Sequence, residues 1–159
     1  MGFHGTEAAG TREVEDVRSE VKTISSDLLD LTGLRGTVSE PGPGVVTCAD
    51  RERGEYFFVR HTWSVKEVPE SELERAMADL RDGLPGRGWE VAKYGPNNSP
   101  AGTLELLAGL EPEQYTAEIS FLDGRNLDPE TDLSTESMLY VMVRSACYRV
   151  PEGQTVTQY

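Results

Sequence analysis

The sequence contains few of the residues on which enzymes and metal sites most often depend. It has two histidines and two cysteines in 159 residues, and neither histidine stands at metal-ligand spacing from a cysteine. No apolar run approaches the roughly 18 residues that a membrane-spanning helix needs. Residues 1–5 lack the basic and apolar segments of a signal peptide. No catalytic motif stands out, so the sequence predicts architecture and compartment rather than chemistry.

Basic charge is also scarce. The chain has 15 Lys and Arg against 28 Asp and Glu, a formal net charge of −13. Such a field repels nucleic acid and anionic lipid headgroups, so we expect no nucleic-acid partner. The main effect expected of the charge is solubility.

The apolar residues are clustered, as in one domain with a single core. Residues 1–10 are small and polar and predict a flexible tether. Residues 11–150 predict the domain, and residues 151–159 a polar tail. A helix is predicted over residues 12–33, because apolar side chains recur there every three or four positions. They are Val14, Val17, Val21, Ile24, Leu28 and Leu31.

The ends of this first helix also carry signals. Thr11 is a candidate N-cap, and Gly33 a candidate C-terminal stop. The apolar stripe spans about three heptads, and packing on the same domain is favoured over a coiled-coil seam.

Alternating residues over 55–68 predict a strand, with Trp63 and His61 on one face. The motif Ser71-Glu72-Leu73-Glu74 predicts a capping box that opens a second helix. Residues 36–44 predict a linker or surface loop. Four more strands are expected, at residues 89–94, 103–110, 115–121 and 138–148. The order predicts an α+β fold, an antiparallel sheet of about five strands with two helices packed on one face.

Cys48 and Cys147 stand at the edges of two of these strand-like segments. If the two strands are antiparallel neighbours, the start of one meets the end of the other. We predict a disulfide there, with two buried free thiols as the alternative. The bond would indicate an oxidising compartment outside the cytoplasm. It would also leave the first helix outside the closed loop, free to move or to meet a partner.

The acidic segment at residues 123–136 is the one candidate metal site. Asp128, Glu130 and Asp132 supply alternating oxygen ligands of the kind that calcium prefers. The turn glycine of an EF-hand loop is missing, and Pro129 stiffens the segment. We therefore interpret it as a solvated acidic loop, and we predict no metal or other cofactor.

Other candidate site residues are weaker. His61 is predicted to be a packed side chain rather than a base, and Ser64 lies on the opposite strand face. Most aromatic residues are expected in the core or in cross-strand pairs. A ligand or partner surface is the alternative role, and its candidates are Leu28, Trp63, Tyr94 and Tyr140.

Several features resemble the mature ectodomains of small secreted proteins and lipoproteins of actinobacteria. These are the small polar N-terminus, the long first helix and Cys48 before the strand at 57–65. The others are the helix ending in Gly88-Trp89-Glu90-Val91 and the last strand ending in Ser145-Ala146-Cys147. The resemblance covers about residues 11–150. It implies export, a disulfide and a lipid anchor on a cysteine before Gly2, which this chain does not contain, and it brings no catalytic residues.

We therefore expect an extracytoplasmic, membrane-tethered, non-catalytic domain that binds a protein or a small ligand at the cell envelope. A monomer or a weak homodimer is expected. Two alternatives stay open: a secreted hydrolase that uses carboxylates from separate loops, and a structural component of the envelope.

Overall fold

The computed structural model describes residues 9–39, 42–49, 54–100, 102–110, 115–125 and 136–156. Two helices, a short 3-10 helix and eight strands lie within these ranges. They follow in the order α1 (Val14–Thr32), β1 (Thr37–Val38), β2 (Gly44–Thr47), β3 (Tyr56–Lys66), α2 (Glu70–Gly83), η1 (Pro85–Arg87), β4 (Trp89–Pro96), β5 (Leu104–Leu110), β6 (Tyr115–Leu122), β7 (Met138–Ser145) and β8 (Tyr148–Arg149).

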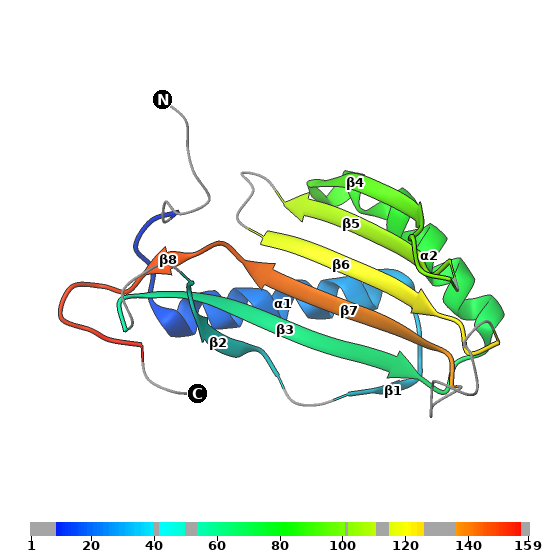
Figure 1. Ribbon diagram of the computed structural model, residues 1–159, viewed down its shortest axis with the longest axis horizontal. Helices are drawn as coiled ribbons and strands as arrows, with labels where there is room; N and C mark the ends of the chain where they lie inside the picture. The colour runs from blue at the N-terminus through cyan, green and yellow to red at the C-terminus, as the bar shows by residue number, and fades with distance from the viewer. Residues whose placement is uncertain are drawn as a thin grey trace.

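Among the described residues, the strands form one open antiparallel sheet (Figure 1). The order is β1-β3-β7-β6-β5-β4, and β2 and β8 both pair with β3. Both helices lie on one face of the sheet, α1 against β3 and β7, and α2 against β6 and β7. The predicted α+β fold is confirmed, but the sheet has eight strands instead of about five.

The three extra strands are short and all lie along β3. β1 pairs with the end of β3, and β2 pairs with residues 57–60. The loop prediction for residues 36–44 was therefore wrong at its two ends, because strands of two and four residues show no detectable periodicity. Gly36 allows the approach to β3, since a Cβ there would lie 2.2 Å from the carbonyl oxygen of Lys66.

The apolar stripe of α1 packs on the sheet. Val17 and Val21 are fully buried and Leu28 is 2% exposed, which is the intramolecular packing that the sequence favoured. Gly33 ends the helix in the left-handed conformation, with φ of 67°, a backbone geometry that suits glycine.

The start of α1 differs from the prediction. Thr11 does not cap the helix, because Glu13 is the N-cap residue. The backbone of residues 9–12 instead runs beside β8: the Arg149 N–H donates to the Gly10 carbonyl, and the Ala9 N–H donates to the Cys147 carbonyl, both at 2.8 Å. The last two residues of the predicted tether thus belong to the fold, and residues 1–8 lie outside the described ranges.

The predicted capping box of α2 is wrong. The helix begins at Glu70, with Pro69 as the N-cap and no side-chain cap. Ser71 lies inside the first turn, two residues after the capping position. The apolar face of α2 packs in the core, with Leu73 and Leu80 fully buried.

The predicted disulfide joins Cys48 and Cys147, with Cα atoms 6.3 Å apart. Cys48 follows β2, and Cys147 lies between β7 and β8. Because β2 and β7–β8 flank β3 on opposite sides, the bond ties together the two neighbours of β3. The expectation that α1 would be free to move is wrong, because its buried stripe is part of the core.

Beyond residue 150, the predicted polar tail is tied to the fold in part. The Val156 N–H donates to the Gly54 carbonyl at 2.8 Å, and the Val156 side chain packs against the core.

Candidate functional site

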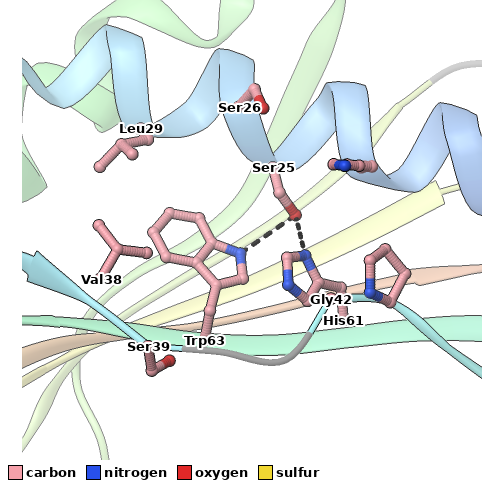
Figure 2. Close-up of a pocket in the computed structure, with 10 residues that line it drawn as sticks. Ser25, Ser26, Leu29, Val38, Ser39, Gly42, His61 and Trp63 are labelled. Carbon is pink, nitrogen blue, oxygen red and sulfur yellow. Dashed lines mark hydrogen bonds between the residues drawn. The ribbon is translucent and has the colours of Figure 1, made fainter.

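A small hollow lies between α1 and β3 (Figure 2). Its volume is about 150 Å³, the space of a few water molecules or a small organic molecule. The described residues that line it are Lys22, Ser25, Ser26, Leu29, Val38, Ser39, Gly42, Pro43, His61 and Trp63. No aspartate or glutamate is among them.

Three side chains converge at this hollow through hydrogen bonds (Figure 2). The Trp63 Nε1–H donates to Ser25 Oγ at 3.1 Å. Ser25 Oγ also lies 2.8 Å from His61 Nδ1. Because an indole nitrogen can only donate, Ser25 accepts from Trp63. The bond to His61 then runs in either direction, from serine to neutral imidazole or from an Nδ1–H to serine.

The local sequence explains this convergence. His61 and Trp63 are two residues apart on β3 and share the face that α1 covers. Ser25 lies four residues after Val21, so it belongs to the buried face of α1, and it is 5% exposed. Ser25 was not among the candidate residues predicted from the sequence, although a serine within an apolar helical stripe is the signal that would have identified it.

The outer wall is formed by Val38, Ser39, Gly42 and Pro43. The Ser39 N–H donates to the Ser64 carbonyl at 3.0 Å, and the Ser64 N–H donates to Ser39 Oγ at 2.9 Å. These bonds hold Ser39 against the edge of β3. A second hollow of about 550 Å³ continues along α1 and shares Lys22, Gly42 and Pro43 with the first.

The hollow combines an apolar wall with polar groups. Leu29, Val38 and the Trp63 ring supply the apolar part, while Ser26 and Lys22 supply hydrogen-bond donors. Binding sites for small molecules have this composition. The size limits an occupant to a few heavy atoms or to one side chain of a partner.

The other predicted surface residues are placed differently. Leu28 is in the core at 2% exposure, so its assignment to a partner surface was wrong. Tyr94 is half-buried, with the Arg81 guanidinium 5.0 Å from its ring centroid. Tyr140 is 42% exposed on the sheet face opposite the helices. Trp63 is 3% exposed and contributes to the hollow.

The calcium candidates Asp128, Glu130 and Asp132 lie outside the described residues. In the part of the chain that is described, no group of three or more His, Cys, Asp or Glu side chains is placed to hold a metal ion. Neither described helix is both long and apolar enough to cross a membrane.

A charged cluster fixes the start of α1 to the sheet. Glu20 accepts hydrogen bonds from Arg12 and from the Tyr115 hydroxyl, and the Arg12 guanidinium stacks over Tyr148 at 5.4 Å. Partial burial acts to raise the pKa of Glu20, but the bonds from Arg12 and Tyr115 outweigh it and the pKa is lowered. Burial, followed by the bond to Glu20, raises the pKa of Tyr115 well above its ordinary value.

Comparison of the chain with protein-family models, with curated proteins and with solved structures found no match.

Proposed function

We propose that this protein is an extracytoplasmic, non-catalytic binding domain, tethered at the cell envelope, whose ligand site is the hollow at Ser25, His61 and Trp63. The observation that carries the proposal is the hydrogen-bonded convergence of these three side chains. A buried polar cluster beside an open hollow presents fixed donors and acceptors to an occupant. The ligand is a small polar molecule or one polar side chain of an envelope protein.

The disulfide supports the compartment, because such bonds persist mainly outside reducing cytosol. Cell fractionation after alkylation of free thiols tests it. We expect Cys48 and Cys147 to be oxidised in a protein recovered outside the cytoplasm. Recovery in the cytosolic fraction with two alkylated thiols would contradict the proposal.

NMR titration with a library of small polar fragments tests the site. We expect at least one fragment to shift the indole N–H signal of Trp63 but not that of Trp89. Val38→Phe should abolish the shift, because Val38 lines the hollow and a larger ring would fill it. Thr37→Phe is the matched control, since Thr37 is exposed and does not line the hollow. Fragments that bind equally well to both variants would refute the assignment.

A hydrolase is the second candidate, because Ser25 Oγ is 2.8 Å from His61 Nδ1, the contact expected of a nucleophile and its base. Two features favour binding over catalysis. The serine is 5% exposed, and its oxygen already accepts the Trp63 N–H, which withdraws electron density from the nucleophile. Labelling of Ser25 by a fluorophosphonate probe, absent in Ser25→Ala, would establish the hydrolase instead.

A further inference from the structure

One face of the sheet is covered by neither helix. The two helices pack on the face that carries Phe57, Val59, Val141 and Val143. Alternation places the neighbouring residues of each strand on the opposite, open face. Among the described strand residues on that face, the basic side chains outnumber the acidic ones, although the whole chain has a net charge of −13. The basic ones are Arg60, Lys66, Lys93, Arg144 and Arg149, and the acidic ones are Glu90, Glu105 and Glu118.

Two of these arginines are direct cross-strand neighbours. Arg60 on β3 pairs with Arg144 on β7, and both are exposed. The Tyr56 carbonyl accepts from the Cys48 N–H, and Ser64 exchanges hydrogen bonds with Ser39, on the side of β3 away from β7. The even-numbered residues of β3 therefore direct their backbone N–H and C=O groups away from β7. Arg60 and Arg144 therefore form a non-hydrogen-bonded pair, the kind that brings opposite side chains closest.

This pairing is unfavourable for the free protein. Like charges directly opposite each other destabilise a sheet. Among the described residues, no carboxylate forms an ion pair with Arg60 or Arg144, whereas Arg12, Arg18, Arg81 and Arg149 each have one carboxylate partner and Arg125 has two. An anion between the two guanidinium groups would remove the repulsion.

Aromatic stacking prepares one guanidinium for such a ligand. The Arg144 Cζ atom lies 4.2 Å from the ring centroid of Phe58. Stacking holds the plane of the guanidinium against the ring and leaves its N–H edge available for hydrogen bonds. Thr116, the neighbour of Arg144 on β6, adds a hydroxyl group.

We propose that Arg60, Arg144 and Thr116 form a binding site for a phosphate monoester, separate from the hollow beside α1. Arginine forks bind phosphate and carboxylate oxygens in pairs. A carboxylate has two oxygens and satisfies one fork, whereas a monoester has three terminal oxygens and up to two negative charges, enough for both arginines. A long polyanion is disfavoured, because it would extend from this face onto the acidic remainder of the surface.

The adjoining hollow accommodates the rest of the ligand. It has a volume of about 710 Å³ and includes Arg144, Thr116, Leu107, Glu118 and Glu90 in its lining. Leu107 offers apolar contact. Glu118, a diagonal neighbour of Arg144 across β6 and β7, and Glu90, three strands away on β4, favour a hydroxyl or an amine on the ligand. Phosphoethanolamine, a free monoester, has this distribution of charge, and phosphatidic acid presents a phosphate monoester as part of a lipid.

NMR titration of the intact, oxidised protein tests the site, with inorganic phosphate, phosphoethanolamine and vesicles containing phosphatidic acid as probes. We expect the backbone signals of Arg60, Arg144 and Thr116 to shift at phosphate concentrations up to about 10 mM. Phosphoethanolamine should bind more tightly than inorganic phosphate. Shifts with the free probes indicate a soluble ligand, and binding to the vesicles alone indicates a lipid headgroup; both support the phosphate site.

Arg144→Gln and Arg60→Gln should each weaken binding of phosphoethanolamine at least about tenfold. Arg75→Gln, an exposed arginine on α2, is the matched control and should bind like the original protein. Both test residues are exposed, and an unchanged melting temperature would show that the variants fold. Absence of binding to all three probes, or equal binding by the Arg144 and Arg75 variants, would overturn the proposal.

Discussion

Removal of the Cys48–Cys147 disulfide is predicted to remove a large part of the stability of this domain. The two cysteines are 99 residues apart in the sequence. In the chain-entropy model, a cross-link over such a loop destabilises the unfolded chain by about 4.7 kcal/mol at 25 °C. A single domain has a total stability of about 5–15 kcal/mol. The bond therefore represents about a third of the total if stability is near the upper limit, and nearly all of it if stability is near the lower limit.

The assay is urea unfolding of the oxidised protein and of a variant with Cys48→Ala and Cys147→Ala. With a slope of about 2 kcal/mol/M, the midpoint should fall by about 2 M. The original protein in reductant should behave like the double variant, and reductant should not change the double variant. A loss of less than about 1 kcal/mol would refute the argument, because the unfolded chain would then be little constrained by the bond.

The remaining predictions concern α1 and its contacts with the sheet. Leu28→Ala should lower the free energy of unfolding by about 2–5 kcal/mol, whereas exposed Asp27→Ala should change it by less than about 0.5 kcal/mol; similar losses in both would contradict the packing of α1. Ser25→Ala should cost about 1–3 kcal/mol in the same assay, because it leaves the buried Trp63 N–H without its acceptor, and an unchanged midpoint would contradict that bond. The lowered pKa of Glu20 stabilises the fold above the unfolded-state pKa, and this contribution is lost as pH falls through the folded-state pKa. Unfolding curves should therefore separate the original protein from Glu20→Gln at neutral pH and converge in acid; a constant difference would exclude the linkage.

The structure changes the meaning of the net charge. From composition alone, a charge of −13 predicts an anion-repelling surface. The strand register gathers basic side chains on the open face, including the opposed pair Arg60 and Arg144. A net charge is a sum over the chain, whereas a ligand meets the charges of one face.

Local patterns in the sequence were enough to predict most of the long elements. The apolar stripe of α1 and the alternation in β3 and β6 are repeats within one segment, so each could be detected without knowing its neighbours. The glycine stop at Gly33 and the pairing of Cys48 with Cys147 were also predicted from the sequence. The helix starts were not, because capping depends on the backbone angles of one or two residues.

Only the tertiary structure determined the site and the short strands. β1 and β2 exist because their backbone groups pair with β3, and a segment of two to four residues has too few positions to show a period. Ser25 and His61 are 36 residues apart and meet only because α1 packs across β3. The sequence by itself thus determined which segments are helical or extended, since that depends on nearby residues. Which side chains meet depends on strand order and register, and these are set by the packing of the whole chain.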